Sequence, residues 1–209
     1  MRDKKIKIIK NKKEKQIKFQ NRAWPFELDT LETYAYWHPV FTPEECKKII
    51  DIGNKKGLEE GKIRTGLSKG VRESNVSWLY SSDDLDWAFG RITDVIMNLN
   101  KDFFKFDLFG FIEGFQFTHY KAPNGNYKKH IDKGKNSYIR KLSLSVQLSD
   151  PSSYEGGDFV LYEGVKPTVL PKEQGKLIAF PSYTLHEVKP VTKGERYSLV
   201  AWITGPQFK

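Results

Sequence analysis

The stretch RKLSLSVQLSDPSSYEGGDFVLYEG, residues 140–164, indicates the fold class of this chain. Its first part alternates apolar and polar residues, its last part is rich in aromatic and β-branched residues, and Pro, Ser and Gly lie between them. Such runs are typical of short β-strands joined by turns. Similar runs are FIEGFQFTHY (111–120), KLIAFP (176–181) and RYSLVAWI (196–203). Because no helical pattern separates them, the sequence predicts an antiparallel β sandwich or barrel from residue 110 onward.

Two helices are predicted before this β-rich part. Thr42 suits the N-cap position of the first helix, Pro43 its first turn, and Glu45 the closing position of a capping box. Gly57 is expected to end this helix. The second helix is expected within residues 81–100, where apolar residues recur at spacings of three and four after a cluster of serines and acids. The expected fold class is therefore α+β, and mainly β.

The basic charge of the chain is concentrated in its first residues. The formal net charge is +9, and residues 1–22 hold ten Lys or Arg against Asp3 and Glu14, which leaves +1 for residues 23–209. We therefore expect a basic leader, 1–22, before a single domain, 23–209. The nearly neutral domain makes a nucleic-acid partner an unfavoured interpretation.

Composition also limits where the protein acts. Cys46 is the only cysteine of the 209 residues, so no intramolecular disulfide can form. No stretch approaches the 18 or more apolar residues of a membrane-spanning helix. The expectation is a cytoplasmic protein without a membrane partner, and the sequence leaves its oligomeric state open.

A possible metal site is indicated by YKKHID, residues 127–132. In an extended segment, His130 and Asp132 project to the same side and can both reach one ion. His186, after the run KLIAFP, can bring a second imidazole from a neighbouring strand. Two histidines and one carboxylate are the ligand set of non-haem Fe(II) oxygenases. The sequence therefore predicts a metal site formed by these three residues.

An arginine follows ten residues later. Alternation places Arg196, Ser198, Val200 and Trp202 on one face of a strand. A buried arginine requires an anion, and two alternatives are open: a bound carboxylate, or a salt bridge to an acidic residue of the protein. Tyr120 can donate to the same anion. Two other candidates, His38 and His119, are expected to lie outside the site, and Gly156 and Gly157 are expected to allow a tight turn or a close backbone approach.

These motifs together resemble a known family. The run from Tyr120 through Tyr127 and His130 to Asp132, followed by RKLSLSVQLSDPSSYEGGDF and FPSYTLHEVKPVTKGERYSLVAW, is similar to the Fe(II)- and 2-oxoglutarate-dependent oxygenases of the prolyl 4-hydroxylase type. The resemblance covers about residues 38–206. It implies a double-stranded β-helix, a distorted jelly roll, with supporting helices from the N-terminal half.

The resemblance also assigns roles to the metal and cosubstrate residues. It implies that His130, Asp132 and His186 bind Fe(II) and carry the catalysis, and that Arg196 binds the C5 carboxylate of 2-oxoglutarate. Tyr120 matches a tyrosine that contacts this cosubstrate in the family. The implied cofactors are Fe(II), 2-oxoglutarate and dioxygen, with ascorbate left open.

Further positions match residues around the cosubstrate and the substrate. Ser198 and Gln147 are the additional cosubstrate positions that the resemblance implies. Tyr127, Arg140 and Trp202 match positions near the substrate in the hypoxia-factor prolyl hydroxylases. The resemblance therefore implies a hydroxylase acting on a prolyl residue of a peptide or protein, with succinate and carbon dioxide as co-products.

Two departures from related enzymes limit the substrate. Collagen-type prolyl hydroxylases usually have lysine where this chain has Arg196, so collagen-like specificity does not follow. Nucleic-acid demethylating oxygenases carry a second arginine six residues later, where this chain has Trp202. The alternatives that stay open are a hydroxylase of another side chain or of a small molecule, and a non-catalytic jelly-roll binding module.

Overall fold

The computed structural model describes residues 32–62, 70–82, 84–134 and 139–207. The expected leader, 1–22, and the expected start of the domain at residue 23 lie outside these ranges. Neither helix in the described part of the chain has the length and hydropathy needed to cross a bilayer.

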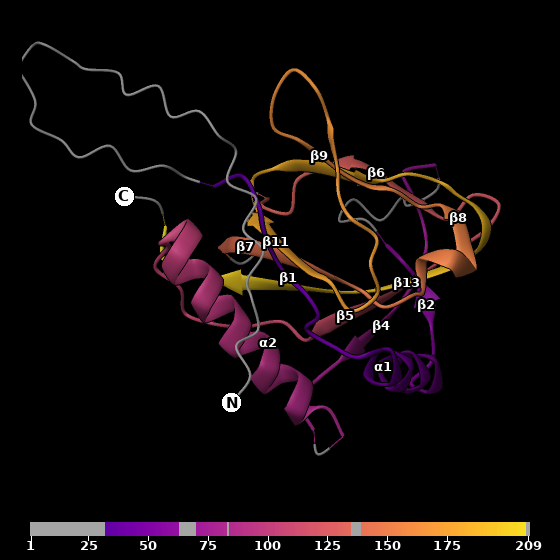
Figure 1. Ribbon diagram of the computed structural model, residues 1–209, viewed down its shortest axis with the longest axis horizontal. Helices are drawn as coiled ribbons and strands as arrows, with labels where there is room; N and C mark the ends of the chain where they lie inside the picture. The colour runs from indigo at the N-terminus through magenta and orange to yellow at the C-terminus, as the bar shows by residue number, and fades with distance from the viewer. Residues whose placement is uncertain (1–31, 63–69, 83, 135–138, 208–209) are drawn as a thin grey trace, which may run out of the picture. The chain divides into compact units, whose positions relative to one another are not determined.

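Two antiparallel sheets form the framework of the described domain (Figure 1). The larger sheet has the order β1 (Ala35–Trp37), β11 (Leu177–Pro181), β7 (Arg140–Gln147), β13 (Val191–Thr204), β5 (Phe115–Lys121), β4 (Asn75–Leu79), β2 (Glu59–Glu60), and β8 (Tyr154–Gly156) pairs with β13. The smaller sheet has the order β10 (Thr168–Val169), β9 (Phe159–Tyr162), β12 (Leu185–Val188), β6 (Asn126–His130), β3 (Arg72–Glu73). Each of the five predicted runs contains a strand, so the antiparallel prediction is confirmed.

Both predicted helices are present. Helix α1 (Pro43–Lys55) begins with the expected capping box, in which Thr42 N donates to Glu45 Oε2 at 2.9 Å and Glu45 N donates to Thr42 Oγ1 at 3.3 Å. Gly57 follows the helix with φ +92°, a conformation that glycine adopts without strain.

The second helix begins differently from the prediction. Helix α2 (Asp86–Leu99) has Leu85 at its N-cap and no side-chain capping bond, so the serine and acid cluster does not supply a cap. Leu85 N and Asp86 N instead donate to the Ser82 carbonyl oxygen. A π-helical turn, η1 (Asn100–Phe104), continues α2, and a 3₁₀ turn, η2 (Pro151–Ser153), lies between β7 and β8.

The helices cover one face of the larger sheet. In Figure 1, α1 and α2 lie below the larger sheet, and β6 and β9 of the smaller sheet lie above it. A single apolar cluster joins Ile49 of α1 and Ile92 of α2 to Phe117, Leu142 and Leu199 of the larger sheet, all at most 1% exposed. This face is closed by apolar packing, which leaves the opposite face, toward the smaller sheet, for the site.

Candidate active site

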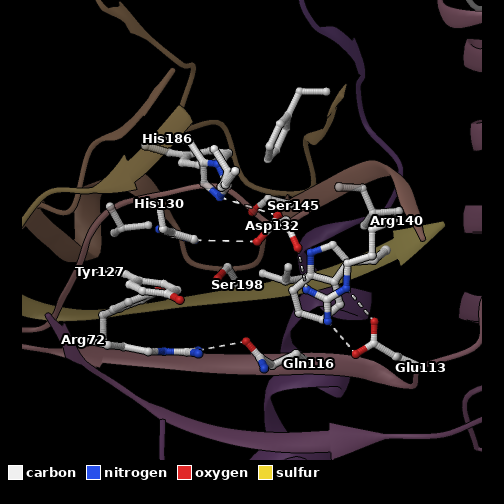
Figure 2. Close-up of a pocket in the computed structure, with 18 of the residues that line it drawn as sticks. Arg72, Glu113, Gln116, Tyr127, His130, Asp132, Arg140, Ser145, His186 and Ser198 are labelled. Atoms are coloured by element: carbon white, nitrogen blue, oxygen red, sulfur yellow. Dashed lines mark hydrogen bonds and ion pairs between the residues drawn. The ribbon is translucent and has the colours of Figure 1, made fainter. Parts of the chain in front are cut away.

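A cavity of about 380 Å³ lies between the two sheets (Figure 2). Its polar lining includes all three predicted metal ligands and most of the predicted binding residues. These lining residues are Tyr120, Tyr127, His130, Asp132, Arg140, His186, Arg196, Ser198 and Trp202. A volume of this size suits a small cosubstrate together with one side chain of a substrate.

The smaller sheet and a following bend position the metal-ligand candidates. His130 ends β6 and stands directly opposite His186 of β12 in the strand register. Asp132 lies beyond the strand, so the expectation that strand alternation aligns it with His130 is wrong. Instead, the backbone N–H groups of Asp132 and Lys133 both donate to the Ser182 carbonyl oxygen at 3.0 Å, which fixes the bend beside the two imidazoles.

The three side chains converge on one point. His130 Nε2 lies 3.7 Å from Asp132 Oδ1, and His186 Nε2 lies 3.6 Å from Asp132 Oδ2. One ligand atom from each residue lies within 4.8 Å of the other two. Ligands about 2.1 Å from one ion and at right angles to each other lie roughly 3 Å apart. The His-to-Asp separations are within an ångström of that spacing, so these residues fit a metal ion.

Hydrogen bonds set the orientation of each ligand. Nδ1 of His130 lies 2.7 Å from the Lys128 carbonyl oxygen, and Nδ1 of His186 lies 2.9 Å from that of Thr184. In each pair the Nδ1–H group donates a hydrogen bond to the carbonyl oxygen, so each Nε2 is left with a lone pair that faces the site. Ser143 Oγ donates to Asp132 Oδ2 at 2.6 Å and orients the carboxylate.

The ionisation states also suit a metal. Burial, with His186 nearby, lowers the pKa of His130 to about 4, so this imidazole is neutral at neutral pH. Burial alone would raise the pKa of Asp132, but the two imidazoles and the Ser143 hydroxyl together hold it below its usual range. A neutral imidazole and an ionised carboxylate are the forms that bind metals.

Arg196 lines the same cavity from the larger sheet, on the side opposite the smaller sheet. It is 1% exposed, stands opposite Tyr120 in the register of β13 and β5, and has its guanidinium carbon 5.3 Å from the Tyr120 ring centre. Its Nη2 donates to Gln147 Oε1 at 2.8 Å, whereas its buried Nη1 has no partner. Within the described ranges no carboxylate pairs with Arg196, which excludes a described acidic residue as its partner.

Close backbone packing surrounds this arginine. Gly157 has φ +61°, and a Cβ atom there would lie 3.0 Å from Arg196 Cδ. The expected close approach at this glycine pair is therefore confirmed. Gln147 is not in the cavity lining; it contacts Arg196 instead, while Ser198 lines the cavity two residues further along β13.

The expected substrate residues also line the cavity. Tyr127 stacks on His130 with ring centres 3.6 Å apart. Arg140 forms a bidentate pair with Glu113, at 2.7 and 2.5 Å, and its guanidinium carbon lies 3.7 Å from the Trp202 ring centre. Figure 2 shows the Arg140–Glu113 pair on the side of the cavity away from Tyr127.

The cavity lining also contains polar residues that were not predicted as site residues: Lys62, Arg72, Glu113, Gln116 and Ser145. Arg72 of β3 alternates with Ser74, Val76 and Trp78, and this pattern was a signal that it shares a face with an aromatic residue of the cavity. Glu113 precedes β5, outside any strand, and no spacing in the sequence marks it.

The remaining candidates lie outside the site, as expected. His38 is exposed. His119 stacks on Tyr197 with ring centres 4.5 Å apart and is absent from the cavity lining. Cys46 is fully buried in α1, and burial raises the pKa of its thiol to about 12, so the thiol is unreactive at neutral pH.

Comparison with known proteins agrees with this geometry. A sequence model of the 2OG-Fe(II) oxygenase superfamily matches residues 115–204, the segment that contains all three ligand candidates and Arg196. A PKHD-type hydroxylase of Aliarcobacter butzleri (strain RM4018) is 33% identical over 173 residues, which cover 78% of this chain and 75% of the relative. The chain belongs to the 2OG-Fe(II) oxygenases. A PKHD-type hydroxylase of Prochlorococcus marinus (strain MIT 9211) is 37% identical over 187 residues, 79% of this oxygenase and 76% of the relative.

Solved structures establish the fold of this oxygenase. A Pseudomonas putida prolyl-4-hydroxylase matches with TM-score 0.65 and 18% identity, over 84% of this chain and 94% of that chain. A Trichoplax adhaerens prolyl hydroxylase, solved with a peptide fragment of the hypoxia inducible factor oxygen degradation domain, matches with TM-score 0.70 and 17% identity, over 83% and 84%. The fold is the expected double-stranded β-helix. The protein is a 2-oxoglutarate-dependent dioxygenase that shares its fold with prolyl 4-hydroxylases, and its family uses Fe(II), 2-oxoglutarate and dioxygen.

Proposed function

We propose that this oxygenase hydroxylates a prolyl residue in a peptide or protein. The observation that carries the proposal is the pairing, in one cavity, of the His130, Asp132 and His186 cluster with the unpaired buried charge of Arg196. Prolyl hydroxylases are among the proteins that share its fold, and one was solved with a peptide, which supports a prolyl peptide as the substrate class.

The residues divide into a metal end and a cosubstrate end. His130, Asp132 and His186 would hold Fe(II) through Nε2, a carboxylate oxygen and Nε2. Arg196 would bind the far carboxylate of 2-oxoglutarate, because its Nη1 has two protons to donate and a planar fork fits a carboxylate. When bound, Fe(II) and 2-oxoglutarate would activate dioxygen, which is the oxidant: one oxygen atom would enter the C–H bond of the substrate and the other would enter succinate, with carbon dioxide as the second co-product.

Other residues would prepare the site for the cosubstrate and substrate. Gln147 holds one edge of the Arg196 guanidinium so that the other edge faces the ligand. Burial raises the pKa of Tyr127, so its phenol keeps a proton that can be donated to a substrate. Phe159 and Phe180 pack edge-on against His186, at 5.8 and 4.9 Å between ring centres, and exclude water from that side.

The test is succinate formation from 2-oxoglutarate in the presence of Fe(II), ascorbate and air, with and without proline-containing peptides. We expect peptide-stimulated succinate and a product 16 Da heavier than the peptide, and neither from a His130→Ala variant. His38→Ala, which removes an exposed histidine outside the site, is the matched control and should keep wild-type activity.

Two results would contradict the proposal at different levels. Succinate formation that no peptide stimulates would leave the dioxygenase and remove the prolyl substrate, in favour of a small molecule or another side chain. A protein that binds neither metal nor 2-oxoglutarate would favour a non-catalytic jelly-roll binding module.

A further inference from the structure

Resting on the proposed function, we propose that the prolyl substrate carries a carboxylate close to the residue that is hydroxylated, and that Arg72 binds this carboxylate. Arg72 lines the cavity from β3 and is 6% exposed. Figure 2 shows it below Tyr127, on the opposite side of the cavity from Arg140 and Glu113.

Neutral oxygens hold the guanidinium in place. Arg72 Nε donates to Ser74 Oγ and Arg72 Nη2 donates to Gln116 Oε1, each at 2.8 Å. These bonds orient the guanidinium but leave its positive charge unbalanced, because a hydroxyl and an amide are neutral. Nη1 donates to none of the residues that the structure describes, so this nitrogen has protons available for a ligand.

Arg72 is the buried cation of the cavity that lacks a counter-charge, whereas Lys62, which also lines the cavity, is exposed to solvent. Arg140 is neutralised by Glu113. With Fe(II) and the 2-oxoglutarate dianion bound, those two ligands cancel each other, and Asp132 balances Arg196. Arg72 has no carboxylate at ion-pair distance among the described residues. The positive charge of Arg72 therefore stays unbalanced in the loaded cavity. Burying an unpaired charge is unfavourable unless an anion joins it, and a planar guanidinium fits a carboxylate.

The position of Arg72 ties this anion to the reacting part of the substrate. The guanidinium carbon lies 4.7 Å from the Tyr127 ring centre, and His130 stacks on the same ring with ring centres 3.6 Å apart. One aromatic ring therefore separates the guanidinium from a metal ligand. A carboxylate bound there belongs to a group within a residue or two of the oxidised carbon, not to a remote part of a protein substrate.

A glycine makes room for this arrangement. A Cβ atom on Gly61 would lie 2.8 Å from Arg72 Nε and 2.6 Å from Ser74 Oγ, and Gly61 N donates to the Ser74 carbonyl oxygen at 2.7 Å. The backbone of Gly61 thus packs directly against the guanidinium and fixes it from behind. A side chain at this position would force Ser74 or Arg72 to shift and would disturb the bond between them.

The experiment uses paired proline peptides that differ only in Asp against Asn at one of the two positions on either side of the proline. Affinity is measured by calorimetry without oxygen on protein loaded with Mn(II) and 2-oxoglutarate, and KM and kcat by succinate formation with Fe(II) in air. At the matching position, we expect the Asp peptide to bind about ten- to a hundredfold more tightly than the Asn peptide, as expected for a hydrogen-bonded charge pair.

The variants separate recognition from structural support. Arg72→Gln should bring the Asp-to-Asn affinity ratio close to one, and Arg72→Lys should keep part of it. A purely structural role would weaken both peptides equally and leave the ratio unchanged. Arg91→Gln is the control, because Arg91 is a partly exposed arginine paired with Glu45 outside the cavity, and it should keep the wild-type ratio. Gly61→Ala, which crowds the Arg72 guanidinium and its Ser74 partner but keeps the charge, should lower the ratio even where Arg72→Gln folds poorly.

The remaining outcomes would each contradict either the role of Arg72 or the proposed function. Equal affinity for Asp and Asn peptides at every position, or a ratio that persists in Arg72→Gln, overturns the inference. The inference is also overturned if the protein converts 2-oxoglutarate to succinate but binds no acidic peptide. Absence of both Mn(II) and 2-oxoglutarate binding in the wild type would instead contradict the proposed function itself.

Discussion

Both faces of strands β7 and β13 contain fully buried residues, but those residues differ in what they contact. Toward the helices the strands present Leu142, Val146, Leu199, Ala201 and Ile203, each at most 2% exposed and packed in the apolar cluster. Toward the smaller sheet they present Ser143, Gln147, Arg196 and Ser198, also at most 2% exposed. The first face is complete without a ligand. The second contains a charge without a partner, so burial alone does not distinguish a core residue from a binding residue.

This difference predicts opposite responses to substitution. On the helix-covered face, truncation should lower the free energy of unfolding and leave ligand affinity unchanged in the folded protein. On the cavity face, truncation of a polar group that has no charged partner should lower ligand affinity and leave the stability of the ligand-free protein unchanged or higher, because an unpaired polar group is lost.

The largest effect is expected from Asp132→Ala. The variant loses the one anionic ligand, so metal affinity should fall by more than the roughly 10–100-fold that follows the loss of an outer-sphere partner. In the wild type, a divalent metal should raise the melting temperature, because it binds the folded state, and a chelator should reverse this rise. The variant should show neither change. A metal-dependent rise equal to that of wild type would place the metal elsewhere, and Asp150→Ala is a control for loss of an exposed carboxylate.

On the closed face, Leu199→Ala should cost about 2–5 kcal/mol in the free energy of unfolding, as large-to-small changes in well-packed cores do. Chemical denaturation of the metal-free protein measures this cost. At temperatures where the variant is folded, its affinity for Mn(II) and 2-oxoglutarate should match that of wild type. A large loss of affinity would mean that the two faces are coupled. It would contradict the prediction that the helix-covered face affects stability but not ligand affinity.

Two arginines of the cavity face should differ in their effect on the stability of the ligand-free protein. Arg196→Met removes an unpaired buried charge, so we expect the ligand-free protein to be at least as stable as wild type, while 2-oxoglutarate affinity falls at least about tenfold. Arg140→Met leaves Glu113 without its partner and should destabilise the ligand-free protein by about 2 kcal/mol, less than a fully buried pair because both side chains are 15–17% exposed. Thermal unfolding of both variants without ligands is the measurement. The opposite order of stabilities would contradict the assignment of Arg196 as an arginine without an acidic partner among the described residues.

The features that could be predicted from the sequence are those set by local patterns. Period-two runs gave the strands, and a Thr-Pro-x-Glu start gave α1, because a strand face and a capping box depend on residues a few positions apart. Arg196 and Ser198 could be placed on the cavity face for the same reason. The roles of these residues still came from a family resemblance, since alternation alone does not say which face of a strand meets a ligand.

The features that could not be predicted depend on contacts between distant segments. Asp132 lies beside the two histidines as predicted, but not for the predicted reason, because its position is set by the Ser182 carbonyl oxygen, fifty residues away, and not by strand alternation. Arg72 reaches the cavity because the chain passes from β3 of the smaller sheet to β4 of the larger one within a few residues. Glu113 belongs to the site only because Arg140 lies opposite it in the folded chain.

The smallest expected effect concerns His119, a polar residue within the helix-covered side of β5. Its Nε2 lies 3.3 Å from Glu195 Oε2, its ring stacks on Tyr197, and Lys121 follows two residues later. Burial lowers the pKa of His119 below its ordinary 6.5, and Lys121 adds to this, while Glu195 opposes it. The folded state therefore binds a proton less readily than the unfolded state.

The sign of the pH dependence follows from that difference. Stability from His119 is complete above about pH 6.5 and is lost as the pH falls below this value, because the unfolded chain takes up the proton first. His119→Phe keeps the stacking on Tyr197 and removes the proton site, so its stability should fall less between pH 7 and 5.5. The difference should be a fraction of the ~1.4 kcal/mol per pH unit that one proton allows. Chemical denaturation of the metal-free proteins at both pH values measures it. Equal pH slopes in the two proteins would mean that Glu195 compensates the burial of the imidazole, so that the closed face tolerates a titratable group without any dependence on pH.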